Sequence, residues 1–413
     1  MLNPIALAIP VFFVSIGLEV WVARRRKLAV YRLTDSMVDL ASGTLQQVAR
    51  IFDTALVIWL YDRLYAHRLI DFQSPIASPW TWLIAFLGFD LGYYWFHRAS
   101  HRINFFWASH ITHHQSEEYN LSVALRQSLT SAFTSLPFTI WLALCGVPTL
   151  VYAIIGSLSL LYQFWIHTEL IGKLGWFERV FNTPSQHRVH HATNPRYLDM
   201  NYAGTLCIWD RMFGTFVPES EEAVYGLVKS FGSFQPLWAQ FHRYVELAQL
   251  SWAAPAFKDK LLVWVKGPEW SVPGLLAFGA PPEVSRDTQV KYDPTVQPAL
   301  RRYLWVQLVA TMCGAFVLLF FQHQLPFPIV AGGAAIVVLS VTCWGGLIEA
   351  RSWALPLEGL RLLLLAAGAL LALHQALPLP ALLVLVLGFT GLQAWLLRAG
   401  LTQQQGPDKV ATA

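Results

Sequence analysis

Charged residues are scarce in this chain. Lys, Arg, Asp and Glu make up 13% of its 413 residues, whereas a typical soluble domain carries about 25%. The net charge is only +4 and the basic residues are scattered, which argues against nucleic-acid binding. The four cysteines lie far apart and form no C-x-x-C pair, so neither a disulfide framework nor a thiolate metal site is indicated. What the chain has in excess is hydrophobic residues, at 55%.

Long apolar runs account for this composition. A transmembrane helix needs roughly 20 apolar residues. Nine segments reach or approach that length: 4–23, 45–64, 79–96, 128–146, 149–167, 300–322, 327–347, 358–375 and 380–398. The first run precedes the basic residues 24–27, the reverse order of a secretory signal, so we expect a retained span. The segment 45–64 is the weakest of the nine because it contains Arg50 and Asp53, and we expect the fourth and fifth segments to form a helical hairpin.

Basic residues in the short loops predict the orientation, because cytoplasmic loops carry an excess of Lys and Arg. Loop 24–44 contains five of them. If that loop is cytoplasmic, the N-terminus lies outside and the stretches 97–127 and 168–299 lie inside. The loops left outside near 147, 324 and 377 contain no Lys or Arg, and only the outside loop 65–78, with Arg68, departs from the rule. The chain is therefore predicted to be a polytopic integral membrane protein with a large cytoplasmic part.

Histidines form three clusters with the spacing of metal ligands. The clusters are His97 and His101; His110, His113 and His114; and His187, His190 and His191. Residues three and four apart share a helix face, so each cluster is expected to aim its imidazoles at one point. A zinc site uses three or four protein ligands, so eight histidines are too many for one ion and match two. Two solvated histidines at a membrane interface would be ordinary, but three clusters predicted on one side indicate a site.

His167, at the end of the fifth segment, is a ninth candidate. It returns to the side where the three clusters are expected, either as a ligand or as a hydrogen-bond partner of one, and we favour a ligand. The remaining histidines stand alone or fall on the opposite side, and are not expected to bind metal: His67, His242, His323 and His374.

An all-nitrogen ligand set suits iron, zinc, copper or nickel. Zinc would support a membrane hydrolase, which normally needs only one ion. Eight or nine neutral imidazoles beside a lipid phase suit two iron ions and oxygen chemistry better. Soluble di-iron bundles use Glu with E-x-x-H instead, a pair that the apolar segments lack. A transporter with histidine proton relays is a further alternative, but relay residues would lie at mid-span rather than at span ends.

Longer stretches around the histidines make a family resemblance specific. The chain resembles the fatty acid hydroxylase/sterol desaturase superfamily, and within it the alkylglycerol monooxygenases, from about residue 80 to 245. The stretches that carry the resemblance are His97–His101, Trp107–His110, His113–His114, Glu118–Ser122, Ala124–Ser128, Leu161–Glu169, Asn182–Ser185, His187–His191, Asn201–Gly204, Ile208–Arg211 and Phe213–Phe216. The last four apolar segments offer no motif.

The resemblance implies an oxidoreductase that oxygenates the O-alkyl carbon of an ether lipid and releases a fatty aldehyde and glycerol. It implies two iron ions, molecular oxygen and a lipid substrate. The electron donor would be tetrahydrobiopterin, or else a cytochrome b5- or ferredoxin-type carrier. Arg102 departs from the pattern of that branch, which has an acidic residue directly after the first histidine pair. This leaves the metal ligands intact and keeps hydroxylation or desaturation of a sterol, fatty acid or other lipid as the alternative.

The predicted architecture is all-α, a polytopic integral membrane bundle with a cytoplasmic helical cap that holds a histidine-rich dinuclear metal site. We expect N-terminal transmembrane segments over 1–78, the fatty acid hydroxylase-type catalytic domain over 79–245, an interfacial segment over 246–299 and a C-terminal transmembrane bundle over 300–413. Within this plan, 233–268 alternates aromatic and charged residues, which fits either an amphipathic helix in the membrane interface or a helix that packs on its own domain.

Polar residues close to the clusters are the other site candidates. Glu118, Asn120 and Tyr202 are predicted catalytic residues, and Arg126 and Gln127 are predicted to bind a cofactor or a lipid headgroup. Contacts to imidazole N–H groups are the expected role of the residues just after the second cluster. For each of these residues an ordinary capping or loop hydrogen bond is the alternative, as it is for the neighbours Glu117, Asn201 and Asp210.

Overall fold

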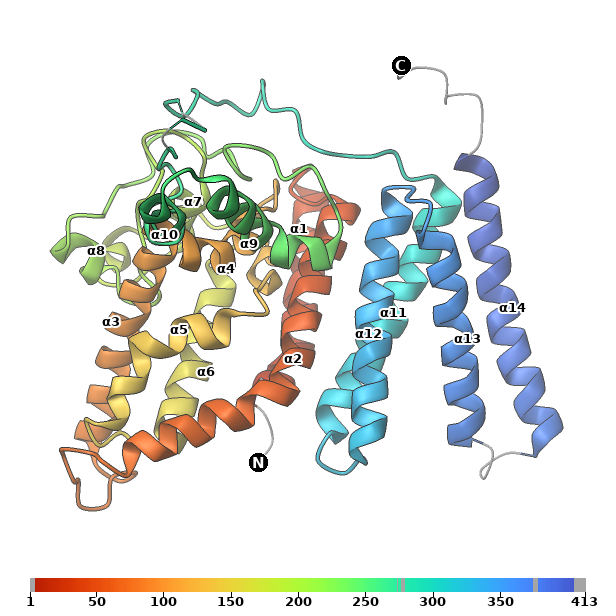
Figure 1. Ribbon diagram of the computed structural model, residues 1–413, viewed down its shortest axis with the longest axis horizontal. Helices are drawn as coiled ribbons and strands as arrows, with labels where there is room; N and C mark the ends of the chain where they lie inside the picture. Colours follow the sequence, from red (N-terminus) through yellow and green to blue (C-terminus); the bar gives the residue numbers. More distant parts are fainter. Residues whose placement is uncertain (1–3, 273, 276–278, 374–377, 405–413) are drawn as a thin grey trace. The chain divides into compact units, whose positions relative to one another are not determined.

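The computed structural model describes residues 4–272, 274–275, 279–373 and 378–404. Every regular element in these ranges is a helix, and the only strand-like pairings are two isolated bridges (Figure 1). The predicted all-α fold is therefore confirmed. The chain divides into two compact units, the first formed by Met1–Gly232 with Trp238–Tyr292 and the second by Ser233–Leu237 with Asp293–Ala413.

The first unit contains ten α-helices and three short 3₁₀ segments among its described residues. They are α1 (Pro4–Arg25), α2 (Leu33–Tyr65), α3 (Pro79–Arg102), α4 (Asn104–His114), η1 (Val123–Leu125), α5 (Ser131–Thr139), η2 (Ile140–Ala143), α6 (Thr149–Trp165), η3 (Gly175–Arg179), α7 (Pro184–His191), α8 (Ile208–Met212), α9 (Pro236–Ala253) and α10 (Phe257–Val265). Helix α3 contacts α4, α5 and α6, and α1 and α2 also contact α6. Helices α4, α7, α9 and α10 gather at one end of this unit and form its cap (Figure 1).

Four described helices are long and apolar enough to cross a membrane: Leu7–Arg25, Pro298–Phe321, Phe327–Ile348 and Ala354–Leu371. The predicted segments 45–64 and 79–96 are also helical, within α2 and α3, but are not among these four. Helix α6 is apolar but has only 17 residues. The sequence therefore predicts most of the helices. By length and composition, however, only four of the described helices qualify as membrane spans, fewer than the nine predicted segments.

The predicted single span over 128–146 is wrong. Helix α5 covers nine residues, and the 3₁₀ segment η2 follows it directly. Pro137 lies inside α5 and has no N–H to donate, so one hydrogen bond is missing from the helix shortly before it ends at Thr139. Gly146, at φ 80°, then turns the chain towards α6.

The amphipathic segment 233–268 forms the two helices α9 and α10. One face of the pair packs on its own unit, where Leu247, Ala254 and Val263 form a buried cluster with Ala108 of α4. The interpretation as helices that pack on their own domain therefore holds for this face. Their outer face is considered below.

The second unit is a four-helix bundle of α11 (Pro298–Phe321), α12 (Phe327–Ile348), α13 (Ala354–Leu373) and α14 (Leu379–Gln404). Each helix contacts two others, in the ring order α11, α12, α13, α14. The sequence offers no motif here, but the structure shows a buried polar cluster, the bundle cluster, with members from all four helices. Its members are Tyr303, Gln307, Ser340, Glu358, Arg361 and Gln393.

Candidate metal centre

The structure brings all nine candidate histidines together in two groups that can each hold a metal ion. Within each group one ring nitrogen per residue lies within 4.8 Å of the others. Site A consists of His97, His101, His110, His114 and His190, and site B of His113, His167, His187 and His191. The two sites are adjacent, since the rings of His114 and His191 stack with centroids 4.4 Å apart.

Each H-x-x-H-H motif divides its imidazoles between the two sites. His110 and His114 belong to site A, whereas His113 belongs to site B. In the second motif His187 and His191 belong to site B and His190 to site A. The expectation that each cluster aims at one point is therefore wrong for these two motifs. The reason is the helix pitch: at 3.6 residues per turn, residues i and i+4 project to one side while i+3 projects to the other.

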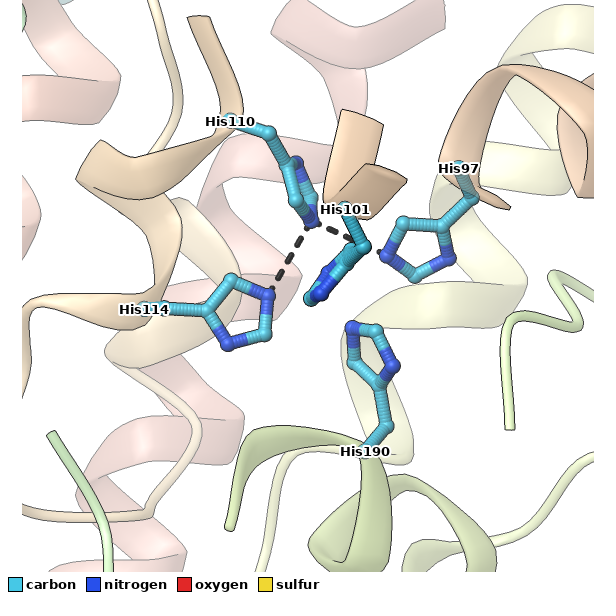
Figure 2. Close-up of side chains that lie close together, drawn as sticks. All are labelled: His97, His101, His110, His114 and His190. Carbon is cyan, nitrogen blue, oxygen red and sulfur yellow. Dashed lines mark hydrogen bonds between the residues drawn. The ribbon is translucent and has the colours of Figure 1, made fainter. Parts of the chain in front are cut away.

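In site A the five rings converge from three helices (Figure 2). The Nε2 of His110 lies 2.9 Å from the Nε2 of His97 and 3.1 Å from the Nε2 of His114. Ligand nitrogens that sit 2.0–2.1 Å from a common ion are about 3 Å apart at tetrahedral or octahedral angles. The spacing in site A therefore fits a shared ion.

In site B hydrogen bonds to carbonyls decide which ring nitrogens carry protons. The Nδ1 of His113 lies 3.0 Å from the carbonyl oxygen of Arg126, and the Nδ1 of His167 lies 2.7 Å from that of Gln163. A carbonyl only accepts, so both Nδ1 atoms donate and both neutral rings have a lone pair at Nε2. These two Nε2 atoms face each other at 3.2 Å. Two facing lone pairs repel unless a cation lies between them.

Four buried ring nitrogens lack a hydrogen-bond partner among the described residues. They are Nε2 of His101 and His190 in site A, and Nδ1 of His187 and Nε2 of His191 in site B. An unpaired buried polar atom costs about 1–3 kcal/mol, so native proteins rarely leave several together. A bound metal ion in each site would satisfy three of them, the Nε2 atoms of His101, His190 and His191. His187 faces site B with its Nε2, 3.0 Å from that of His167, so its Nδ1 would stay unpaired. The residues present therefore fit the metal that the histidine pattern implies.

Burial favours the neutral form of His110, His113 and His190, which is the form that binds metal. It lowers the pKa of His113 to about 4. Burial, together with the neighbouring imidazoles, also holds the pKa of His110 and His190 well below the usual range. The sites are therefore preorganised for a cation at neutral pH.

A loop after α7 supplies backbone carbonyls to site A. The carbonyl of Tyr202 accepts from Nδ1 of His97 at 2.8 Å, and that of Met200 accepts from Nδ1 of His190 at 3.1 Å. The carboxylate of Asp210 accepts from the backbone N–H of Tyr202 at 2.8 Å and fixes this loop. Tyr202 is buried, with its ring centroid 5.4 Å from that of His101. Tyr202 and Asp210, both singled out from the sequence, thus lie beside site A.

Asp90 holds the continuation of this loop against α3. Its carboxylate accepts from the backbone N–H groups of Thr205 and Leu206 at 2.8 and 3.0 Å, and from the indole of Trp209 at 2.9 Å. The sequence hinted at this role only through an acidic residue inside an apolar segment.

Asp199 contacts site A directly and was not predicted. Its Oδ1 lies 3.5 Å from Nδ1 of His101, and its Oδ2 accepts from Arg102 at 2.7 Å. Burial opposes ionisation of Asp199, but the contacts with His101 and Arg102 outweigh it and lower the pKa of the carboxyl. Asp199 has φ 59°, a strained conformation for a residue with a side chain. Arg102, the departure from the expected pattern, thus pairs with an acid that touches a candidate ligand.

Arg126 and Gln127, the predicted cofactor-binding residues, make contacts inside the protein. The guanidinium of Arg126 is buried and donates to the carbonyl of Thr112, to Asp39 and to Gln115. Its backbone carbonyl orients His113, as described above. Gln127 donates to the carbonyl of Ala124 at 3.0 Å.

Glu118 and Asn120, the predicted catalytic residues, hold neighbouring segments. The carboxylate of Glu118 accepts from Arg32 at 2.5 Å and from Lys291 at 2.7 Å. The amide of Asn120 donates to the carbonyl of Val30 at 2.6 Å. These contacts tie the chain after α4 to the basic loop that follows α1.

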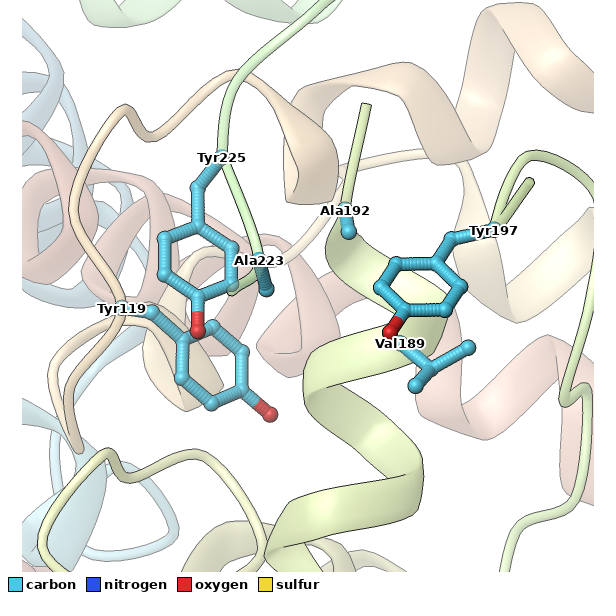
Figure 3. Close-up of a cluster of buried hydrophobic side chains, with 6 residues drawn as sticks. All are labelled: Tyr119, Val189, Ala192, Tyr197, Ala223 and Tyr225. Carbon is cyan, nitrogen blue, oxygen red and sulfur yellow. The ribbon is translucent and has the colours of Figure 1, made fainter. Parts of the chain in front are cut away.

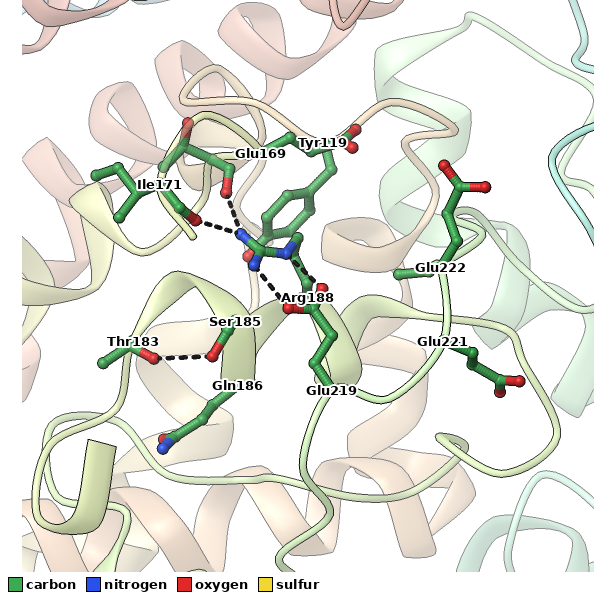
Figure 4. A network of polar contacts seen from close by, with 12 residues as sticks. Tyr119, Glu169, Ile171, Thr183, Ser185, Gln186, Arg188, Glu219, Glu221 and Glu222 are labelled. Atoms are coloured by element: carbon green, nitrogen blue, oxygen red, sulfur yellow. Dashed lines mark hydrogen bonds and ion pairs between the residues drawn. The ribbon is translucent and has the colours of Figure 1, made fainter. Parts of the chain in front are cut away.

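Arg188, inside the second H-x-x-H-H motif, is a positioning residue that sequence reasoning missed. It pairs with Glu219 at 2.6 Å and donates to the carbonyl of Thr168 at 3.0 Å (Figure 4). Thr168 follows His167 directly, so Arg188 joins the two chain segments that supply His167 and His187 to site B. Its place between two ligand candidates was the available signal.

Glu19 reaches the same region from α1. Its carboxylate accepts from the hydroxyls of Thr168 and Tyr31 and, at 2.8 Å, from the backbone N–H of Leu121. An acidic residue inside an otherwise apolar helix was the signal for this role.

Helix α7 is held rigidly because all eight of its residues are buried. Pro184 opens its first turn, the position where proline is tolerated. Val189 packs in an apolar cluster with Tyr197 and with Tyr119 and Tyr225, whose rings stack 4.8 Å apart (Figure 3). Packing on every side fixes the directions of the histidines that α7 supplies.

Comparison with known proteins agrees with this site. The model of the fatty acid hydroxylase family matches residues 82–215, which include all nine histidines. The alkylglycerol monooxygenase of Xenopus tropicalis is 40% identical over 365 residues, which cover 86% of this chain and 79% of that protein. This chain belongs to the alkylglycerol monooxygenase family. The predicted resemblance is thereby confirmed.

Two further members of the family show similar coverage. The alkylglycerol monooxygenase of Homo sapiens is 40% identical over 81% of this chain and 75% of its own length. That of Danio rerio is 42% identical over the same shares, 81% and 75%. No solved structure matches the chain. With its four apolar helices, this member of the family is an integral membrane protein.

Proposed function

We propose that this protein is a di-iron lipid monooxygenase that cleaves the ether bond of alkylglycerols. The O-alkyl carbon is hydroxylated with one oxygen atom of O₂, and the other leaves as water after a donor supplies two electrons with two protons. The hemiacetal then loses its C–O bond to glycerol and gives a fatty aldehyde. Relatives that are about 40% identical over most of the chain are alkylglycerol monooxygenases, which supports this reaction.

The observation that carries the proposal is the lone-pair geometry of the two histidine sites. Sites A and B offer five and four ligand nitrogens, several of them unpaired or facing another lone pair. Bound iron would supply the activation of O₂ that acid–base side chains cannot provide. Imidazole suits both iron and zinc, so the supply of each metal in the cell contributes to which one is bound.

The protein's own residues orient and shield the two sites. Carbonyl groups of Tyr202 and Arg126 fix the rings of His97 and His113, and Asp199 touches His101. Such partners typically change metal affinity or activity 10- to 100-fold when they are removed. Eight of the nine histidines are buried and His110 is half-buried, which excludes bulk water and limits side reactions of the oxidant. We assign Tyr202 and Asp199 as positioning residues of site A, and Glu118, Asn120 and Arg126 as residues that hold the surrounding segments.

We consider two candidates for the electron donor. Tetrahydrobiopterin is the donor that the family resemblance implies, and a cytochrome b5- or ferredoxin-type carrier is the second. Arg102 bears on this choice less than its charge suggests, because Asp199 neutralises it at 2.7 Å. We therefore propose that Arg102 does not recruit an anionic partner.

We also propose that both sites lie on the cytoplasmic side. The basic loop after α1 is the feature that predicts the orientation, and its Arg32 pairs with Glu117 and Glu118 close to the second histidine cluster. The loop and the cluster therefore share one end of the first unit, whichever side of the membrane that end faces.

Aldehyde release tests the proposed function. The purified protein in detergent or vesicles, given O₂ and an alkylglycerol, should yield one aldehyde for each substrate consumed with at least one of the donors, reduced pterin, ferredoxin or cytochrome b5. Ester-linked monoacylglycerol serves as the matched control substrate and should release no aldehyde. Oxygen uptake without aldehyde would move the assignment to hydroxylation or desaturation of another lipid. Hydrolysis without oxygen uptake would indicate a zinc hydrolase.

A further inference from the structure

The outer face of the helix pair α9–α10 is apolar and exposed. In α10 three residues at four-residue spacing form one stripe, with Phe257 75%, Leu261 56% and Val265 58% exposed. Trp252, near the end of α9, is 86% exposed. Residues i, i+4 and i+8 lie on one face of a helix, so this stripe is continuous rather than scattered. Contiguous exposed apolar faces of this kind mark interaction surfaces.

The opposite face holds the pair firmly to α4, the helix that carries three of the nine histidines. Thr112 of α4 donates to the carbonyl of Ala239 at 2.9 Å, and Arg243 donates to Asn104 at 2.6 Å. The exposed stripe is thus presented by a fixed scaffold and not by a loose segment.

Charge and aromatic placement identify the partner as a lipid surface. Lys258, Lys260 and Lys266 accompany the stripe, and Asp259 is the one acid within α10. Lys260 lies 5.7 Å from the ring centroid of Trp252 and donates to its carbonyl at 3.3 Å. Tryptophan favours the membrane–water interface, and lysines beside an apolar stripe extend to anionic headgroups. The chain is already anchored in a bilayer, so this surface needs no separate targeting.

We propose that the α9–α10 pair lies in the membrane interface, with Trp252, Phe257, Leu261 and Val265 inserted among the lipids. The bilayer surface is the single occupant of this face. Inserted in this way, the pair fixes the depth of α4 and hence of the histidine sites relative to the headgroups. The inference concerns the placement of the cap and stands independently of which lipid is oxidised.

Collision with quenchers in two phases tests this placement. The four native cysteines, Cys145, Cys207, Cys313 and Cys343, are replaced by serine or alanine. Nitroxide labels are then placed singly by Phe257→Cys, Leu261→Cys and Val265→Cys, with exposed controls at Lys258→Cys within α10 and Lys266→Cys directly after it. The full chain is reconstituted in phosphatidylcholine vesicles that contain a minority of phosphatidylglycerol. Electron paramagnetic resonance measures collisions with O₂, which concentrates in the bilayer, and with an aqueous nickel chelate.

The three stripe positions should each show a higher ratio of O₂ to nickel collisions than both controls. The high ratio should thus recur every four residues along α10. Unchanged metal content in each labelled protein shows that the cap is intact. Nickel collisions as frequent as at the controls would mean that the stripe faces water and would overturn the proposal. Protection from both quenchers would overturn it as well, because a second copy or another protein would then cover the stripe.

Discussion

Both units of this chain bury a cluster of polar side chains, but the two clusters differ in whether their polar atoms have hydrogen-bond partners. In the first unit four ring nitrogens of sites A and B find no partner among the described residues. In the bundle cluster of the second unit, Arg361 donates to both oxygens of Glu358, to Ser340 and to Gln307. The hydroxyl of Tyr303 donates to the same Glu358.

This difference distinguishes a metal-binding site from a polar cluster that only holds helices together. A buried charge that is paired on every side needs no ligand, whereas converging lone pairs without protons between them need a cation. The amino-acid types alone do not make this distinction, since ionisable residues inside a membrane bundle are by default functional candidates. Here the pairing inside the bundle cluster favours a role in holding α11 to α14 together.

The largest expected effect is the loss of a candidate ligand. His114→Ala should lower ether-cleavage activity by more than about 100-fold, because even partners one step removed from a metal cost 10- to 100-fold. Turnover measured with saturating substrate and O₂ checks this. His242→Ala is the matched control, a buried histidine outside both sites whose Nδ1 contacts the carbonyl of Ala239. Equal losses in the two variants would mean that the effect is one of folding and not of metal binding.

Breaking the bundle cluster should cost stability and leave the metal in place. Arg361→Met strands the buried Glu358 and is expected to destabilise the bundle by about 3–5 kcal/mol. Thermal unfolding in detergent measures the change. Combining it with Glu358→Leu should recover a large part of the loss, because an apolar pair replaces a charged one. If Arg361→Met instead removed metal while the protein remained folded, the contrast between the two clusters would fail.

A smaller effect is expected at Asp199. Asp199→Asn removes the charge beside His101 and should weaken metal binding in site A by about 10- to 100-fold, with site B unaffected. Competition with a chelator measures this affinity. Asp71→Asn, at an exposed residue that pairs only with the nearby Arg68 in a surface turn, is the control. Unaltered metal release from the Asp199 variant would show that its contact at 3.5 Å is incidental.

The smallest effect is expected at His323, in the turn after α11. His323→Ala should retain activity and metal content at the wild-type level, because the residue lies in the second unit and belongs to neither histidine site. Turnover and metal content of His323→Ala, measured in parallel with those of His114→Ala, check this expectation. His374, for which the same result is expected from the sequence, lies outside the described residues. A loss at His323 comparable to that at His114 would contradict the ligand assignment.

The sequence predicts the helical class, the nine histidines that meet and the family, because each depends on local spacing or composition. The helix pitch separates the i+3 imidazole of each H-x-x-H-H motif from the i and i+4 pair, so His113 and His114 belong to different sites although they are adjacent in the chain. Spacing could not predict which site each imidazole joins, because that depends on how α4 and α7 are turned against each other. The sequence also could not predict which backbone carbonyls orient the rings, because every residue has a carbonyl group.

Long-range pairing explains the other gaps. Asp199 follows the third histidine cluster but contacts His101 of the first, and Glu19 contacts Thr168, which lies 149 residues further along the chain. Glu358 and Arg361 stand at helical spacing at the start of a predicted apolar segment, and the structure buries both of them inside the bundle. Only tertiary packing distinguishes these cases.

The metal content of the native protein tests the central claim most directly. Protein prepared without oxygen and analysed by elemental mass spectrometry should contain about two iron ions per chain, one for each histidine site. His114→Ala and His187→Ala should each lower the content to about one ion, in sites A and B respectively. A wild-type content of one ion or fewer in protein that is fully active would contradict the account. Full activity with zinc alone and without oxygen uptake would contradict it as well.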